Sequence, residues 1–222
     1  MSVWGGEQTC GIGVATANSP QGPFTDHGKM FRSNEIGVQN SIDPSLLQYE
    51  GRNYLVWGSF RGIYVIELTA DGLSIMSGAK KKRIAGTAFE AVYIHKHGDY
   101  YYMFASIGSC CQGVKSTYKV VVGRSKKVWG PYKDKTGKPM LKNGYSLVIG
   151  ANDHFVGNGH GSQIIQDDAG QDWLLYHGFS RSTPENGRIL LLDQIKWDQE
   201  GWPYVEGGSP SYETQKAPVF NN

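Results

Sequence analysis

Short apolar runs separated by polar turns recur along the chain, and they predict strands rather than helices. No long segment keeps the i, i+3, i+4, i+7 apolar spacing of an amphipathic helix. Instead, β-branched and aromatic residues form short runs bounded by Gly, Asn and Asp, as in strands joined by tight turns. We therefore expect an all-β protein.

Three of these stretches have the same form, in which a glycine-containing polar turn separates two apolar runs. This pattern is typical of a β-hairpin. The three stretches are Pro44–Gly58, Glu90–Phe104 and Ser162–His177. A second motif, a strand that ends in Gly-Pro-aromatic, occurs in Gly13–Asp26 and again in Val122–Asp134. Each repeated unit would then hold an inner hairpin followed by outer strands.

Repeated strand-rich units of this kind predict a β-propeller. The first Gly-Pro-aromatic segment has no inner hairpin before it. We therefore expect three complete blades preceded by the tail of another, within a single domain over residues 1–222. A propeller closes only when every blade has two neighbours, because an open end exposes strand edges. Either four blades close here, or something outside this chain completes the ring.

The charge balance does not indicate a nucleic-acid or membrane partner. Lys and Arg number 22 and Asp and Glu number 20, which gives a formal net charge of +2. The only dense basic run, Lys80–Arg83, is expected to be a solvated turn, and no stretch approaches the ~18 apolar residues of a membrane span. The opening Met1–Gly6 has neither the basic start nor the apolar run of a signal peptide. Cys10, Cys110 and Cys111 form neither a disulfide framework nor a CxxC metal site, so we expect packing thiols.

Three polar residues stand at equivalent places, at the start of the inner hairpins. Asp43 precedes the first hairpin, Glu90 begins the second and His160 precedes the third. Because the innermost strands of a propeller begin near its central axis, these side chains would converge on one axial pocket. Each could instead cap a strand or a turn, since Asp-Pro often begins a turn. The remaining histidines have no recognisable ligand spacing: His27, His95, His97, His154 and His177.

The residues around these positions form distinctive motifs, namely Asn40–Ser45, Phe89–Ala91, Ser109–Gly113, Ser116–Ser125 and Gly157–Ser162. Together they resemble glycoside hydrolase family 43, most closely its arabinan endo-1,5-α-L-arabinosidases (arabinanases). The closing segment, Gly187–Pro203, resembles the last blade of that family. The resemblance implies a five-bladed β-propeller, here incomplete at its N-terminus with about three and a half blades. It also implies inverting hydrolysis of α-1,5-linked arabinan by a secreted or periplasmic protein.

The resemblance assigns roles to individual residues. Glu90 corresponds to the general acid, and Asp43 corresponds to a second acidic residue that orients it and disfavours its ionisation. Arg188 resembles the arginine that steadies this aspartate, and His160 resembles an axial histidine beside a bound cation, often calcium, that is held largely through water. A lone histidine is weak support for calcium, which prefers oxygen ligands. By the same likeness, supporting or substrate-binding residues are Asn40, Ser59, Phe60, Phe89 and Cys111.

The general base remains unassigned. Inverting hydrolysis needs a second carboxylate at roughly 6.5–9.5 Å from the acid. In the family this base is an aspartate of the first blade. We find no segment in this sequence that matches that part of the first blade. Asp26 and Asp153 could replace it, but both are expected in turns. Another copy of the chain or a separate fragment could supply the base, a substitute base could exist, or the protein could bind arabino-oligosaccharides with impaired catalysis. An arabinofuranosidase, a xylosidase and a non-enzymatic interaction platform are the further alternatives.

Overall fold

The structure, a computed structural model, describes residues 2–3 and 5–221. Met1 and Trp4 of the opening segment lie outside the described residues. The described chain is built from strands β1 to β16, short 3-10 turns and an α-helix of one turn, α1 (Ser33–Ile36). No helix among these residues has the length and apolar composition that crossing a membrane requires.

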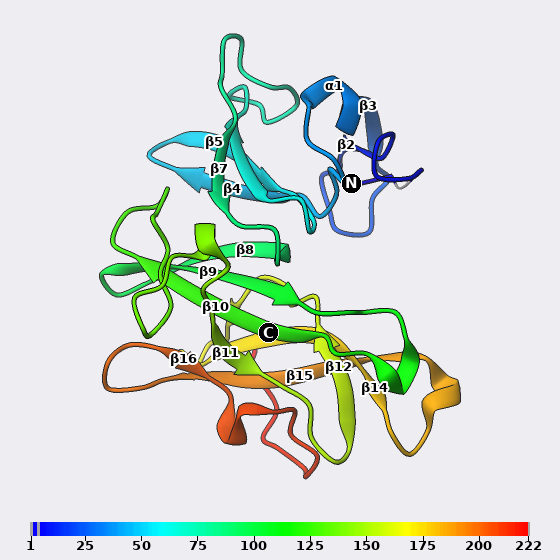
Figure 1. The fold of residues 1–222 in the computed structure, drawn as a ribbon, viewed down its shortest axis with the longest axis vertical. Coiled ribbons are helices and arrows are strands. Elements are labelled where there is room, and N and C mark those ends of the chain that lie inside the picture. Colours follow the sequence, from blue (N-terminus) through cyan, green and yellow to red (C-terminus); the bar gives the residue numbers. More distant parts are fainter. Residues whose placement is uncertain (1, 4, 222) are drawn as a thin grey trace. The chain divides into compact units, whose positions relative to one another are not determined.

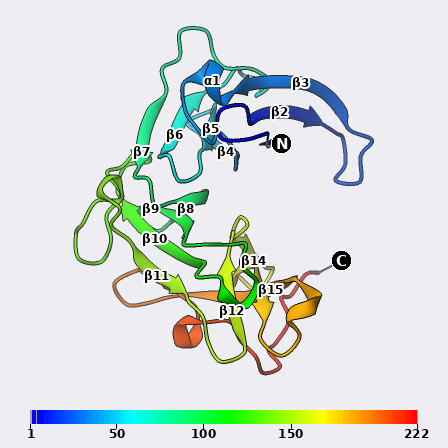
Figure 2. The same ribbon diagram turned by 45° about the vertical axis from the view of Figure 1, so that its right-hand side comes forward.

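The strands form antiparallel sheets of three to five strands each. The first sheet has the order β1-β2-β3 and contains β1 (Ser2–Val3), β2 (Gly11–Thr16) and β3 (Thr25–Arg32). Strands β2 and β3 run side by side as a hairpin (Figure 2). The second sheet follows the chain order and contains β4 (Ser45–Tyr49), β5 (Arg52–Trp57), β6 (Ile63–Glu67) and β7 (Lys82–Ala85).

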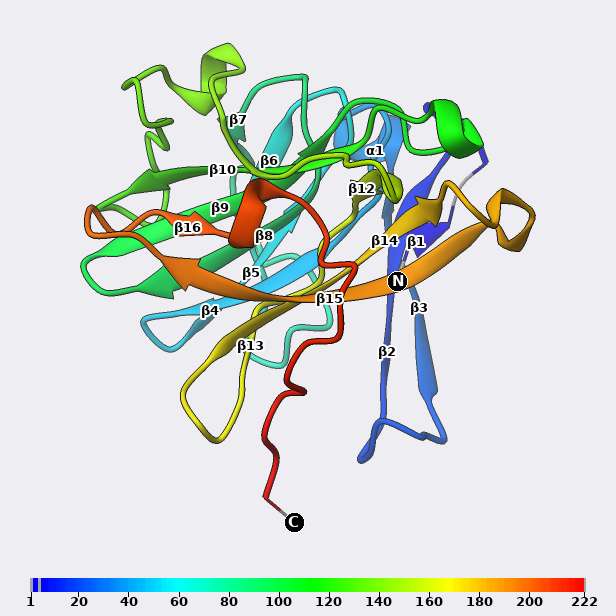
Figure 3. The ribbon, with the colours of Figure 1, turned by 90° about the horizontal axis from the view of Figure 1, so that it is seen from below.

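The other two sheets come from the part of the chain that follows β7. One also follows the chain order and contains β8 (Glu90–His97), β9 (Tyr100–Ile107), β10 (Lys119–Ser125) and β11 (Ser146–Ile149), drawn in green in Figure 1. The last has the order β12-β14-β15-β16 with β13 beside β14, and contains β12 (Phe155–Gly159), β13 (Ile165–Gln166), β14 (Asp172–Ser180), β15 (Arg188–Trp197) and β16 (Pro203–Tyr204). The long strand β15 runs beside β14 (Figure 3).

The first two predicted inner hairpins are confirmed as β4–β5 and β8–β9. The third predicted hairpin is present as β13–β14, but its first strand is short, because only Ile165 and Gln166 pair with β14. His160, which precedes this hairpin, has a left-handed φ of 54° and lies between β12 and β13.

By its internal contacts the chain divides into two compact units. Unit 1 comprises Met1–Val92 and Leu141–Asn143, and unit 2 comprises Tyr93–Met140 and Gly144–Asn222. The division falls inside β8, whose first three residues count with unit 1. The expectation of a single domain over residues 1–222 stays a prediction.

Each unit has its own apolar core. In unit 1, Trp57 is fully buried, and its indole Nε1 donates a 3.0 Å hydrogen bond to Ser41 Oγ, which satisfies the only polar atom of that ring. Phe31, Leu55 and Ile66 pack in the same cluster. In unit 2, the core cluster joins the two sheets and includes buried residues of β9, β10, β11, β14 and β15.

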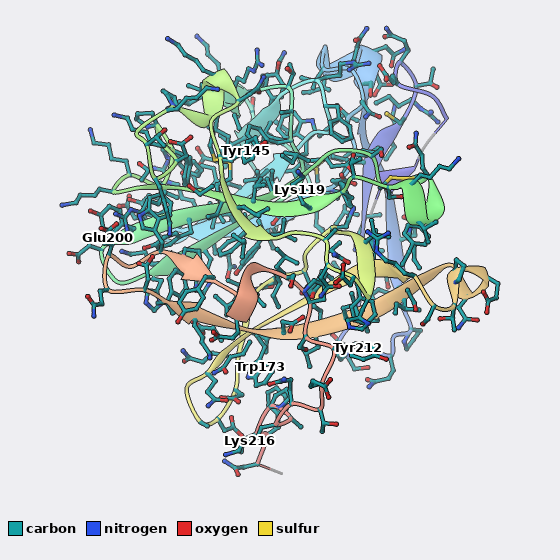
Figure 4. The ribbon with its side chains drawn as sticks, turned by 60° about the horizontal axis from the view of Figure 1, so that its bottom comes forward. Lys119, Tyr145, Trp173, Glu200, Tyr212 and Lys216 are labelled. Atoms are coloured by element: carbon teal, nitrogen blue, oxygen red, sulfur yellow. A yellow bond between two sulfur atoms is a disulfide. The ribbon has the colours of Figure 1, made fainter. Side chains whose placement is uncertain are left out.

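The carboxylate of Asp167 anchors the C-terminal segment of unit 2. It accepts hydrogen bonds from the amides of Ala169 and Gln171, from Trp173 Nε1 and from the amide of Val219. Lys216 of the same segment and Trp173 line one cavity beside β15 (both are labelled in Figure 4). A single buried side chain thus fixes a turn and holds the end of the chain against it.

Candidate functional site

Glu90 is the first residue of β8, and its carboxyl group is buried. Ser59, which is also buried, donates a 2.7 Å hydrogen bond from Oγ to Glu90 Oε2. Since an unpaired carboxyl group is expensive to bury, this hydroxyl group both stabilises and orients the Glu90 side chain.

Asp43 is half-buried and lies two residues before the start of β4. Its Oδ2 accepts a 3.2 Å hydrogen bond from the backbone amide of Ala91, the residue that follows Glu90. Asp43 and Glu90 therefore lie in the same region of unit 1, as the sequence predicts. The Asp43 carboxylate contacts the backbone of the residue next to Glu90.

The backbone around these residues adopts a rare conformation. Asn40, Asp43, Phe60 and Ala91 are not glycines, yet their φ angles are 53°, 55°, 51° and 51°. Residues with a side chain seldom enter this left-handed region, which costs about 1–3 kcal/mol, and they persist there only where their surroundings hold them. His160, the third predicted axial residue, has the same conformation at 54°. Strained backbone of this kind concentrates at functional sites.

Backbone and amide contacts hold the Glu90 region together. Asn40 is buried and donates from Nδ2 to the carbonyl oxygen of Ser59 at 3.0 Å. The amide of Phe60 donates to the carbonyl oxygen of Phe89 at 2.9 Å. The ring of Phe60 is half-buried, whereas that of Phe89 is fully buried. Because it is fully buried, the Phe89 ring has no free face for a sugar ring.

His160 lies in unit 2, and its side chain is exposed. Its amide donates to Ser106 Oγ at 2.8 Å, and its ring stacks near that of His177, with 6.2 Å between the centroids. Burial lowers the pKa of His177 to about 4, and electrostatic interactions with Arg188 and His160 act in the same direction, so His177 is neutral at neutral pH.

This donor set does not form a calcium site by itself. Calcium takes 6–8 oxygen ligands, commonly carboxylates and carbonyls. Among the described residues of unit 2, the groups around His160 are an imidazole and a hydroxyl group, and no cluster of carboxylates accompanies them. Calcium at His160 stays a prediction, and no step proposed below passes through it.

Arg188 begins β15 and contacts the loop that carries Cys110 and Cys111. The expectation that these are packing thiols is wrong, because the two residues form a disulfide bond. The backbone turns sharply in this short loop, which ends in the 3-10 turn Gly113–Lys115, so adjacent side chains can meet. Arg188 Nη2 lies 2.9 Å from Cys111 Sγ. Cys10, by contrast, is a free and buried thiol, as expected.

Other predicted contacts remain open. Arg188 and Asp43 belong to different units, so a contact between them stays a prediction. Asp26 lies in β3, opposite Ala15, and not in the expected turn; it is exposed and accepts a 2.8 Å hydrogen bond from the amide of Gly28. Asp153 is also exposed. Neither position identifies a general base.

Comparison with known proteins shows the family. The family model described as "Glycosyl hydrolases family 43" matches residues 1–203. The chain belongs to this family. An extracellular exo-α-(1→5)-L-arabinofuranosidase of Cellvibrio japonicus is 38% identical over 223 residues, which cover 90% of this chain and 63% of that protein. An extracellular endo-α-(1→5)-L-arabinanase of Bacillus subtilis is 35% identical over 206 residues, with 89% and 61% covered. The chain thus spans less than two thirds of the length of these family 43 relatives.

A solved structure agrees with this family 43 assignment. The α-L-arabinanase of Cellvibrio cellulosa in complex with arabinohexaose matches with a TM-score of 0.83 at 33% identity, over 93% of this chain and 72% of that chain. The predicted all-β, propeller-type fold class is therefore confirmed.

Proposed function

We propose that this family 43 chain acts in the hydrolysis of α-1,5-linked L-arabinan, with Glu90 as the general acid and Asp43 as the residue that positions it. The observation that carries the proposal is the hydrogen bond from the Ala91 amide to Asp43 Oδ2, directly beside the buried Glu90 carboxyl group. The named activities of the relatives in Cellvibrio japonicus and Bacillus subtilis support the choice of linkage.

In this reaction Glu90 gives its proton to the glycosidic oxygen as the bond to the anomeric carbon breaks. Ser59 fixes the direction of the carboxyl group through its hydrogen bond to Oε2, which leaves the other oxygen for the proton transfer. Asp43 anchors the backbone beside Glu90 through its hydrogen bond with the Ala91 amide and so positions the acid.

Water must then attack the anomeric carbon from the opposite face, and inversion requires a carboxylate base on that side. We assign this base to none of the residues discussed here. A second copy of the chain or a separate fragment remains a candidate source. Because the relatives are named extracellular, we also propose that the protein acts outside the cytoplasm on arabinan or arabino-oligosaccharides.

The decisive test compares Glu90→Gln with the unchanged protein on two substrates. Turnover of debranched arabinan is followed by the release of reducing ends, and turnover of an aryl α-L-arabinofuranoside with a strongly acidic phenol is followed by absorbance. We expect Glu90→Gln to lose about 100-fold or more on arabinan, but much less on the aryl glycoside, whose leaving group needs no proton. Glu213→Gln, the same change at an exposed position, is the control and should leave both rates unchanged.

Equal losses on both substrates would contradict the acid role, and unchanged turnover of arabinan would remove Glu90 from the mechanism. Saturable binding of arabino-oligosaccharides without any turnover would favour a sugar-binding function instead. The size distribution of the products distinguishes endo from exo cleavage.

A further inference from the structure

Three potential metal ligands meet in unit 2, and none of them belongs to the Glu90 site of unit 1. His95 and His97 are on β8, and Asp172 is the first residue of β14. Side chains two residues apart on a strand point to the same face, so both imidazoles can face one carboxylate. One ligand atom from each of the three side chains lies within 4.8 Å of the others. The sequence alone did not reveal this cluster, because Asp172 is distant along the chain.

The carboxylate of Asp172 is buried, with only 6% of the residue exposed. Trp197 Nε1 donates to its Oδ2 at 2.7 Å and Gln166 Nε2 donates to its Oδ1 at 3.2 Å, and both donors are neutral. Among the described side chains, no Lys or Arg forms an ion pair with it, and the nearest basic atom is His97 Nδ1 at 3.9 Å. A buried carboxylate without a cationic partner is unfavourable, so a cation bound between it and the two imidazoles would stabilise it. Each carboxylate oxygen keeps a further lone pair for such a cation.

Trp197 contacts and orients both His97 and Asp172. Its ring stacks on His97 at 3.7 Å between centroids, with 7° between the planes, and its Nε1 holds Asp172. Stacking occupies the face of the imidazole and leaves its ring nitrogens, which lie at the edge, available for a metal. Outer groups that fix the direction of a ligand in this way are typical of protein metal sites.

We propose that His95, His97 and Asp172 form a binding site for a divalent transition-metal ion of the Zn²⁺ class. Two imidazoles and one carboxylate suit zinc and its neighbours, whereas Ca²⁺ and Mg²⁺ select oxygen ligands. In a tetrahedral zinc site with bonds of about 2.0–2.1 Å, ligand atoms are roughly 3.4 Å apart. The largest separation between ligand atoms, at most 4.8 Å, must therefore shorten by up to about 1.4 Å, and the half-exposed imidazoles have room to move.

A metal ion at this site would connect two sheets. Strand β8 belongs to the sheet β8–β11 and β14 belongs to the sheet that contains β12–β16, and the two strands are not hydrogen-bonded to each other. The two half-exposed histidines leave a coordination position open to water. A metal that binds only the folded state raises the melting temperature, and this effect is independent of any turnover of sugar.

The test is isothermal titration of the purified protein with ZnCl₂, after treatment with EDTA and removal of the chelator. We expect one saturable site in the unchanged protein and a melting temperature that rises with zinc. His97→Ala and the double variant H95A/H97A should weaken the affinity by about 10–100-fold or more and abolish the rise. His154→Ala, an exposed histidine of the same unit, is the matched control and should bind zinc as the unchanged protein does. His160→Ala should also keep its affinity, which separates this site from His160.

Because Asp172 is buried, Asp172→Asn is interpreted only where circular dichroism shows that the variant is folded. Co²⁺ gives an independent readout, since visible absorption bands of coordinated cobalt should appear in the unchanged protein and be lost in H95A/H97A. Absence of saturable binding, or the same zinc affinity in the unchanged protein and H95A/H97A, would overturn the proposal.

Discussion

Ser59 and Glu90 are 31 positions apart, and the hydroxyl group of one donates a 2.7 Å hydrogen bond to the carboxyl group of the other inside unit 1. We expect Ser59→Ala to lower kcat on arabinan by about tenfold, because a buried carboxyl group that loses its donor also loses its fixed direction. The rate on an activated aryl arabinofuranoside should fall less. Parallel loss on both substrates would show that Ser59 acts on something other than protonation of the leaving group.

Asp43 has two separable contributions, a negative charge and a hydrogen-bond acceptor for the Ala91 amide. Asp43→Asn keeps the acceptor and removes the charge, so we expect a stable protein with kcat lowered about 100-fold. Asp43→Ala removes both, and should in addition lose about 1–2 kcal/mol of unfolding free energy. Urea denaturation and steady-state kinetics measure the two effects. Equal stability of the two variants would show that the hydrogen bond to Ala91 does not hold the backbone.

Gly58 occupies a position that a side chain cannot enter. Its φ is +124°, and a Cβ atom there would lie 2.3 Å from the carbonyl oxygen of Gly62. We expect Gly58→Ala to destabilise the protein by about 2–3 kcal/mol and to disturb the adjacent Ser59. Gly51→Ala is the matched control, because Gly51 also has a positive φ, of +73°, but nothing lies near its Cβ position. It should cost only about 1 kcal/mol, and similar losses in both variants would contradict the steric argument.

Asp167 makes the fold sensitive to acid. Burial alone would raise the pKa of this carboxyl group, but the hydrogen bonds from Gln171, Val219, Trp173 and Ala169 together hold the pKa below its usual value of 3.8. Since the folded state prefers the ionised form, this stabilisation is present above the unfolded pKa and is lost as the pH falls through the lower, folded pKa. Asp167→Asn should therefore lower the melting temperature at pH 7. The difference from the unchanged protein should shrink below about pH 4, and a difference that is constant with pH would exclude the charge as its cause.

The disulfide between Cys110 and Cys111 predicts a simple thiol count. Of the 3 cysteines, Cys10 alone is free and it is buried. The native protein should thus react slowly with a thiol reagent, the denatured protein should show one thiol per chain, and the denatured and reduced protein should show three. Three thiols without reduction would show that the disulfide is absent in solution.

Local patterns were sufficient for some parts of this protein. Alternating apolar residues around a glycine turn predicted hairpins β4–β5 and β8–β9, since both strands and the turn lie within one short segment. The motifs also predicted that Asp43 and Glu90 lie in one region. The hydrogen bond from the Ala91 amide to Asp43 confirms this proximity. The third hairpin, β13–β14, was also predicted, although its first strand is limited to Ile165 and Gln166. The left-handed backbone of His160, which precedes this hairpin, was not predicted, because the surrounding structure and not the local residue pattern determines it.

Features that depend on the path of the chain in space were also missed. Disulfide bonding of adjacent cysteines depends on how their loop turns, which the spacing does not specify. The His95–His97 pair resembles ordinary strand residues until β14 brings a carboxylate to it. Ser59 was noted only through the family resemblance, because a serine that bonds a distant carboxyl group is indistinguishable in sequence from any other serine.

The left-handed backbone at Asn40, Asp43, Phe60, Ala91 and His160 has a consequence for protein engineering. A redesign that optimises each position for backbone compatibility would choose glycine at all five, since glycine alone enters this region without strain. Such a variant could gain thermal stability while losing the carboxylate, amide, ring and imidazole groups that these positions present. Computational stabilisation of this chain is therefore best confined to other positions, with these five residues held fixed.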